Sequence, residues 1–214
     1  MIRDNNIFTT INDTSAYMLG MIWADGNIYY PKDNRKTIVD ITNTDKQIMQ
    51  EMHTILTPNK KLYSYQPKKG KKYYSIKTRD PDITHSLESL GLIPNKSLKA
   101  IWPKIKFDQY LWSFIRGVFD GDGCVFNNKV SGHSYLHISI TGKKNPFIEQ
   151  LFQTFETHSL TPRWYEDPRN TSWQIKIYKK KSIKKFATNI YKQETICMHR
   201  KKQIFLDNKY LNYA

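Results

Sequence analysis

The sequence predicts an α+β protein in which one unit of helices and strands occurs twice along the chain. Two segments of similar design support this prediction: AYMLGMIWADG, which begins at Ala16, and FIRGVFDGDG, which begins at Phe114. Each is an apolar run with a central glycine that ends in a small residue, an aspartate and a glycine. The matching aspartates, Asp25 and Asp122, lie 97 positions apart. Repetition of this kind indicates two copies of one structural unit.

The repeat extends beyond these two segments. DITNTDKQIMQEM, from Asp40, aligns with SITGKKNPFIEQL, from Ser139, at an offset of 99 positions. Both stretches contain apolar residues at the spacing of one helix face, which predicts an amphipathic helix in each half. Thr44 and Gln47 have the spacing of a capping box, which predicts that the first of these helices begins after Thr44.

Each half is therefore expected to run helix, strand, strand, helix, strand, strand, helix. Alternating β-branched and aromatic residues predict the strands. The first half is expected to contain the motif helix, strands at 27–32 and 36–42, a helix at 44–57, strands at 60–66 and 72–79, and a helix at 82–91. The second half is expected to contain the motif helix, strands at 124–128 and 134–141, a helix at 145–158, strands at 162–166 and 172–178, and helices at 181–192 and 198–208. These elements divide the chain into an N-terminal repeat (1–93), a linker (94–110) and a C-terminal repeat (111–214).

Composition narrows the function classes. Lysine and arginine outnumber aspartate and glutamate 34 to 19, which gives a formal net charge of +15. This charge favours a polyanionic partner over a merely soluble basic protein, because each phosphate contact releases counterions. No apolar stretch has the length of a transmembrane helix, and MIRDNNIFTT lacks a signal-peptide core. Two cysteines, Cys124 and Cys197, are too few for a disulfide framework or a zinc site, which predicts a reducing, intracellular compartment.

The small residues in the two motifs predict a close contact between helices. Gly20 and Ala24 are four residues apart, as are their mates Gly117 and Gly121, so each pair lies on one helix face. Two backbones can approach closely where such faces meet. The alternative is a pair of unrelated buried helices that stop at Asp-Gly, and the fixed offset within a larger repeat argues against it.

Packing through these faces would place Asp25 and Asp122 side by side at the helix ends. The helix dipole disfavours a carboxylate at a C-terminus, and two carboxylates repel each other. A divalent cation removes both costs, and oxygen ligands supplemented by water are typical of Mg²⁺. Carboxylates and metal beneath a basic surface are the groups that phosphodiester hydrolysis requires.

The segments MLGMIWADG (18–26) and IRGVFDGDG (115–123) both resemble the LAGLIDADG motif. From about residue 15 to residue 205 the layout is similar to that of single-chain, two-motif LAGLIDADG homing endonucleases. The resemblance implies two αββαββα units whose motif helices form a pseudo-symmetric interface, with two four-stranded antiparallel sheets making a saddle along double-stranded DNA. It also implies a monomer that cuts DNA at a specific site with Mg²⁺, in metal sites that Mn²⁺ or Ca²⁺ can occupy as well. Trp23 replaces the first aspartate of the motif and Asp120 keeps it, a position that is usually not catalytic.

The resemblance also assigns roles to individual residues. Asp25 and Asp122 would bind catalytic metal through their carboxylates, and Ala24 and Gly121 through their backbone carbonyls. Gly20 and Gly117 would lie in the interface between the motif helices.

Three further residues would act near the scissile phosphates. Lys96 and Lys201 are the expected basic pair, with Lys202 as the competitor of Lys201. Asn43 is the expected polar residue, and because its repeat mate is Gly142, this role is present in one half at most. Such an asymmetric centre predicts unequal cleavage of the two strands.

Alternation along the strands predicts which side chains face DNA. Lysine and arginine would hold phosphates, and glutamine and asparagine would contact base edges in the major groove. For any one of these residues, an ordinary solvated strand position is the alternative. The expected DNA-binding residues are Asn27, Tyr29, Lys61, Tyr63, Tyr65, Tyr73, Ser75, Lys77, Arg79, Phe126, Asn128, Arg163, Tyr165, Gln174, Lys176 and Tyr178.

Two other functions compete with the nuclease. An RNA-binding intron maturase would use the same basic surface, as would a DNA-binding protein that does not cleave. The presence of both Asp25 and Asp122 favours the nuclease, because binding alone does not require two adjacent carboxylates.

Overall fold

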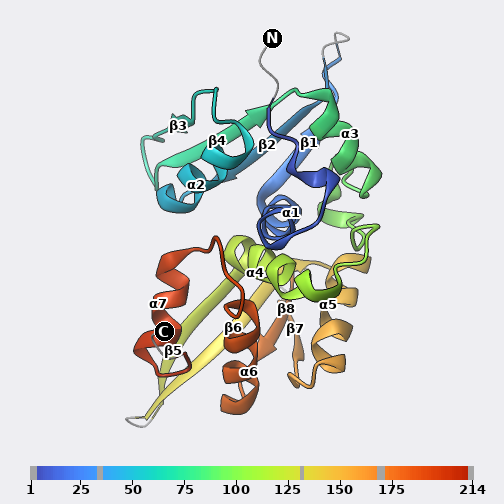
Figure 1. The fold of residues 1–214 in the computed structure, drawn as a ribbon. Helices are drawn as coiled ribbons and strands as arrows, with labels where there is room; N and C mark the ends of the chain where they lie inside the picture. Colours follow the sequence, from blue (N-terminus) through green and yellow to red (C-terminus); the bar gives the residue numbers. More distant parts are fainter. Residues whose placement is uncertain (1–3, 33–35, 131–132, 168–171, 212–214) are drawn as a thin grey trace.

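The computed structural model describes residues 4–32, 36–130, 133–167 and 172–211 (Figure 1). It confirms the predicted α+β fold, with two αββαββα units and a four-stranded antiparallel sheet in each. In the first unit the elements are α1 (Asp13–Asp25), β1 (Gly26–Tyr29), β2 (Ile38–Asn43), α2 (Lys46–Leu56), β3 (Tyr63–Tyr65), β4 (Tyr73–Thr78) and α3 (Pro81–Ser89). In the second they are α4 (Leu111–Asp122), β5 (Gly123–Val130), β6 (His133–Lys143), α5 (Pro146–Thr157), β7 (Arg163–Asp167), β8 (Ser172–Ile177), α6 (Lys180–Ile190) and α7 (His199–Asp207).

The two sheets have the same topology. Their strand orders are β1-β2-β4-β3 and β5-β6-β8-β7, and all neighbouring strands are antiparallel. Residues paired directly across an antiparallel sheet share one face. In the first sheet, Ile41 and Ile76 are such a pair, and both are buried on one face. Ile140 and Ile175 are the corresponding buried pair in the second sheet. The opposite face of each sheet contains most of the polar and aromatic residues predicted to face DNA.

The two motif helices pack against each other at the centre of the molecule, between the two sheets (Figure 1). A Cβ added at Gly20 would lie 2.1 Å from the carbonyl oxygen of Phe114, and one added at Gly117 would lie 2.1 Å from that of Tyr17. Both distances are far below van der Waals contact, so only glycine permits this approach of the two backbones. Buried apolar side chains surround the contact and form one continuous core that includes residues of both units.

The structure corrects the predicted start of the second helix. Asp45, not Thr44, is the N-cap of α2, and its side chain accepts a hydrogen bond from the backbone N–H of Ile48. Asn145 caps α5 in the same way, through the N–H of Ile148. Asp and Asn are among the strongest N-cap residues, and here they prevail over the capping-box spacing.

The segment between the two units packs against the core. It includes two short 3₁₀ helices, η2 (Lys96–Leu98) and η3 (Asp108–Tyr110). The ring of Trp102 contacts the rings of Phe107, Phe114 and Phe147. Among the described residues, no helix combines the length and apolarity needed to cross a bilayer.

Candidate active site

The C-terminal ends of α1 and α4 meet at one point, and the motif aspartates lie there. A Cβ added at Gly121 would lie 2.3 Å from the Cβ of Ala24 and 3.2 Å from Oδ2 of Asp25. Asp25 is half-buried, whereas Asp122 is exposed to solvent on one side. Each helix ends where the chain turns directly into the first strand of its sheet, at Gly26 and Gly123. The small motif residues therefore bring two carboxylates together beside the two sheets.

The surroundings favour the protonated forms of both carboxyl groups. Desolvation, and secondly the nearby charge of Asp25, raises the pKa of Asp122 to about 7, although Lys96 and Lys201 oppose this effect. Desolvation also raises the pKa of Asp25, against the opposing effects of a hydrogen bond from Asn43 and of the same two lysines. A cation bound between these two carboxyl groups would stabilise their charged forms, which desolvation disfavours.

Asn43 is bonded to one of these carboxylates. Its Nδ2 donates a 2.6 Å hydrogen bond to Oδ2 of Asp25, and its Oδ1 accepts a 2.8 Å hydrogen bond from the backbone N–H of Asp45. The second bond fixes which end of the amide faces Asp25. Asn43 is the last residue of β2, so the sheet sets its position.

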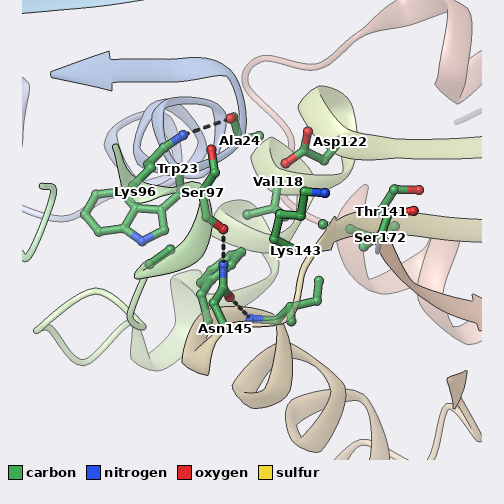
Figure 2. A pocket seen from close by; sticks show the side chains of 15 residues that line it. Trp23, Ala24, Lys96, Ser97, Val118, Asp122, Thr141, Lys143, Asn145 and Ser172 are labelled. Atoms are coloured by element: carbon green, nitrogen blue, oxygen red, sulfur yellow. Dashed lines mark hydrogen bonds between the residues drawn. The ribbon is translucent and has the colours of Figure 1, made fainter. Parts of the chain in front are cut away.

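The corresponding place in the second unit is hollow. Gly142 lines a cavity of about 280 Å³ between the units, together with Asp122, Lys96 and Lys143 (Figure 2). A Cβ added at Gly142 would make only ordinary contact, 3.4 Å from Cδ1 of Ile148. The two sides of the site therefore differ: the Asn43 amide contacts Asp25, whereas open space lies beside Asp122.

Lys96 extends from the beginning of η2 to the end of α1. Its Nζ donates a 3.1 Å hydrogen bond to the carbonyl oxygen of Ala24, as Figure 2 shows. Desolvation lowers the pKa of Lys96, and the charges of Asp122 and Asp25 counteract this effect. The structure thus places this predicted lysine beside both motif aspartates.

Lys201 occupies the corresponding place at the end of α4. Its buried Nζ donates hydrogen bonds of 2.6, 2.8 and 2.5 Å to the carbonyl oxygens of Phe119, Asp120 and Gly123. Desolvation lowers the pKa of Lys201 to about 8, against the opposing charge of Asp120. Lys202 instead pairs with Glu194, so of the two competing lysines Lys201 is the one that contacts the motif helix.

The donor set at the motif ends fits a hard divalent cation. Asp25 and Asp122 supply carboxylate oxygens, and Ala24 and Gly121 supply the adjacent backbone carbonyls. No group of three or more His, Cys, Asp or Glu side chains suited to a metal occurs within the part of the chain that the structure describes. Carboxylate and carbonyl oxygens are the ligands that hard divalent cations take in proteins.

The outward faces of the sheets carry many of the residues predicted to face DNA. Those that are exposed are Asn27, Tyr29, Lys61, Tyr63, Tyr65, Tyr73, Lys77, Arg79, Arg163, Tyr165 and Tyr178, whereas Ser75, Phe126, Gln174 and Lys176 are partly buried. Three of the exposed residues lie outside the observed strands, because β3, β4 and β8 are shorter than expected: they are Lys61, Arg79 and Tyr178. Asn128 belongs to β5, and its side chain lies outside the described ones.

Asp40 lies on the same outward face and was absent from the prediction. It pairs across β2 and β4 with Lys77, whose Nζ lies 3.3 Å from Oδ2 of Asp40. Ser75 and Thr42 donate hydrogen bonds of 2.6 and 3.2 Å to its Oδ1. The alternation of β2 would have placed Asp40 on this face, but a carboxylate is not an expected contact for phosphate.

Comparison with known proteins gives this arrangement a class. Residues 109–191 match the family of LAGLIDADG-like domains. The LAGLIDADG homing endonuclease I-LtrWI, solved bound to target DNA, aligns with a TM-score of 0.61 and 11% identity over 92% of this chain and 89% of that one. I-SmaMI bound to uncleaved DNA with calcium ions gives 0.58 and 13% over 94% and 93%. The meganuclease I-AabMI bound to uncleaved DNA gives 0.59 and 12% over 94% of each chain. No curated protein sequence matches the chain.

The doubled unit and the meeting of the two motif ends are thus found in a chain that shares its architecture with solved LAGLIDADG proteins. Its second repeat matches the LAGLIDADG-like domain family over residues 109–191, and the chain as a whole shares the fold of the solved LAGLIDADG proteins I-LtrWI and I-AabMI.

Proposed function

We propose that the protein is a homing endonuclease that cuts both strands of double-stranded DNA at a long, weakly symmetric site in a reaction that depends on Mg²⁺. The observation that carries the proposal is the meeting of Asp25 and Asp122 where two packed helices end, with Lys96 and Lys201 beside them. The alignment with DNA-bound LAGLIDADG structures supports the same conclusion. A single chain supplies both halves of the centre, so the active form is a monomer.

The two repeats divide the work on the DNA target. Residues 1–93 and 111–214 each present one sheet to one half of the target, and residues 94–110 connect them. Lysine and arginine on the outward faces hold phosphates, while Asn27 and Gln174 contact base edges. Tyrosines at the exposed positions add apolar contact with the sugars and bases.

The motif ends supply the chemistry. Asp25, Asp122 and the carbonyls of Ala24 and Gly121 would hold the divalent cation. When bound, the cation lowers the pKa of a water and stabilises the charge on the leaving oxygen. The positive charges of Lys96 and Lys201, held beside the motif ends by hydrogen bonds to backbone carbonyls, would lower the cost of the negative charge that develops on the phosphate. Asn43 orients the Asp25 carboxylate on its side of the centre.

Cleavage of a randomised double-stranded DNA library tests this proposal. The wild-type protein would be incubated with Mg²⁺, with a chelator in the control, and both ends of every product would be sequenced. We expect a narrow set of long sites cut on both strands, and no products in the chelator. Binding without cleavage would contradict the proposal and favour a DNA-binding regulator. A preference for structured RNA would favour a maturase.

A further inference from the structure

Two positions before its final aspartate, each motif contains a buried polar side chain, and these two side chains have opposite hydrogen-bonding roles. Trp23 is a hydrogen-bond donor and Asp120 is an acceptor, although the two occupy the same place in the repeat. Both are buried. The proposed chemistry uses neither side chain. A shared role must therefore rest on what each one contacts.

Trp23 is bonded to the segment that contains Lys96. Its Nε1 donates a 2.9 Å hydrogen bond to the carbonyl oxygen of Ile101, five residues after Lys96. Between these residues the chain forms a tight turn, in which the N–H of Ala100 donates a 2.7 Å hydrogen bond to the carbonyl of Lys96. Asn145 holds the same turn from the second unit, through a 2.9 Å hydrogen bond to the carbonyl of Ser97. The indole N–H of Trp23 thus provides one of two side-chain hydrogen bonds to the segment that contains Lys96.

Asp120 is bonded to the segment that contains Lys201. Its Oδ2 accepts a 2.7 Å hydrogen bond from the backbone N–H of Met198 and a 2.8 Å hydrogen bond from the hydroxyl of Tyr17. Met198 is the N-cap of α7 and provides no side-chain cap, so the Asp120 carboxylate supplies the negative group that a helix N-terminus favours. Lys201 lies in the first turn of this helix. The position of its backbone therefore depends on the Asp120 carboxylate.

The Asp120 carboxylate has a cost that packing does not explain. Its other oxygen, Oδ1, is buried and has no hydrogen-bond partner among the described residues. A buried polar atom without a partner is unfavourable, so the two hydrogen bonds that Oδ2 accepts must offset the cost of Oδ1. Such a cost is commonly found at functional positions.

We propose that Trp23 and Asp120 are positioning residues that fix Lys96 and Lys201, respectively, at the two motif ends. Each one forms a hydrogen bond with the backbone of the segment from which its lysine extends. Trp23 does so as a donor and Asp120 as an acceptor. The side chain of lysine is long and flexible, so its Nζ stays in place only if its backbone does. This inference rests on the proposed function for its effect on cleavage, but not for its effect on the lysine positions.

Chemical labelling of lysines tests the positions without any DNA. An amine-reactive reagent and mass spectrometry would measure the labelling rates of Lys96 and Lys201 in the folded protein. Trp23→Phe keeps an aromatic ring but removes the donor, so we expect faster labelling of Lys96, by several-fold, and no change at Lys201. Asp120→Leu should speed the labelling of Lys201 and leave that of Lys96 unchanged. Asp120→Asn keeps a hydrogen-bond acceptor, so both lysines should be labelled at rates near those of the wild type. Trp112→Phe, a similar exchange on α4 whose ring contacts His158 and Phe186, is the matched control.

Double-mutant cycles test the link to cleavage. Trp23→Phe should slow single-turnover cleavage of bound DNA by about 10–100-fold without changing the Kd, because a small misplacement of a catalytic group has effects of this size. In a Lys96→Ala background, Trp23→Phe should slow cleavage no further, whereas in a Lys201→Ala background its effect should add. Asp120→Leu should show the reverse pattern.

The two arms separate this inference from the proposed function. If the wild-type protein cuts no DNA, the proposed function fails, and the labelling rates still show whether Trp23 and Asp120 fix the lysines. Unchanged labelling of both lysines would overturn the inference even if cleavage falls. Additive effects with both lysines would also overturn it, because they would indicate a general loss of structure.

Discussion

Asn43 donates a hydrogen bond to Asp25, whereas Gly142, the matching residue of the second repeat, supplies nothing to Asp122 and lines a cavity instead. The two carboxylates at the centre of a nearly symmetric fold are therefore in unequal environments. The difference comes from one position in the sequence, and the backbone around that position is alike in both units.

This inequality predicts unequal rates of cleavage on the two DNA strands. A hydrogen bond to a charged group contributes about 1.5–3 kcal/mol, which corresponds to roughly 10–100-fold in rate. Asn43→Ala should slow one strand by up to this factor, and Gly142→Asn should change the rate of the other strand, since the cavity can hold a side chain. Single-turnover assays with each strand labelled at one end would measure both rates. Equal changes on both strands in both variants would contradict this account.

The contact between the motif helices predicts a large effect of a single methyl group. Gly20→Ala and Gly117→Ala would each place a Cβ 2.1 Å from a backbone carbonyl oxygen, so the helices must move apart. Overpacking of this kind costs about 3 kcal/mol, which lowers the Tm of a protein of this size by about 6–12 °C. Thermal unfolding measures this change. Gly142→Ala, where a Cβ has room, is the control and should stay within about 2 °C of the wild type.

The raised pKa of Asp122 predicts a pH-dependent gain in stability when its charge is removed. In the unfolded chain the group has a pKa of 3.8, and in the folded protein about 7. The folded state therefore holds this proton more tightly, and stability falls as the pH rises through 7. In metal-free protein, Asp122→Asn should raise the Tm at pH 8 by a few degrees and by less at pH 5, since water on the open side limits the effect. A Tm at pH 8 that is unchanged or lower would count against this electrostatic account.

The outward faces of the sheets predict how binding responds to salt. Lys77 and Lys176 occupy matching positions, 99 residues apart, on the two faces. If each one contacts a phosphate, replacing it by alanine should reduce the slope of log K against log salt by about 0.9 and weaken binding to all sequences alike. Lys192→Ala is the control, because Lys192 lies near Asp13, at the opposite end of α1 from Asp25. An unchanged slope for both sheet variants would place DNA elsewhere.

The repeat and the positions of most helices and strands could be predicted from the sequence, because both depend on local patterns of residues. Two apolar runs that end in Asp-Gly, amphipathic helices and alternating strands each leave a periodic signal. The boundaries were less accurate where competing local interactions decide them. At the start of α2 the Asp45 cap determined the boundary, and a short β3 left Lys61 outside its strand.

Features that depend on tertiary contacts were outside the reach of sequence patterns. Arg116 is fully buried and bonds to the carbonyls of Ile190 and Ile196 and to Asp13, although arginine in a helix is usually read as a surface residue. The bonds of Trp23 and Asp120 likewise join residues 78 positions apart. No spacing rule connects such pairs, so only the folded structure shows them.

The two motif aspartates are the groups on which the proposed cleavage depends most, and strand-resolved cleavage of one selected target tests their role directly. Wild type, Asp25→Asn and Asp122→Asn would be compared with Mg²⁺, and DNA binding would be measured for each in Ca²⁺. We expect the wild type to cut both strands, and both variants to bind with similar affinity while losing at least about 100-fold in cleavage, as expected when a carboxylate that holds a catalytic metal is lost. If either variant cuts at the wild-type rate, that aspartate does not hold a catalytic metal, and the central claim is wrong.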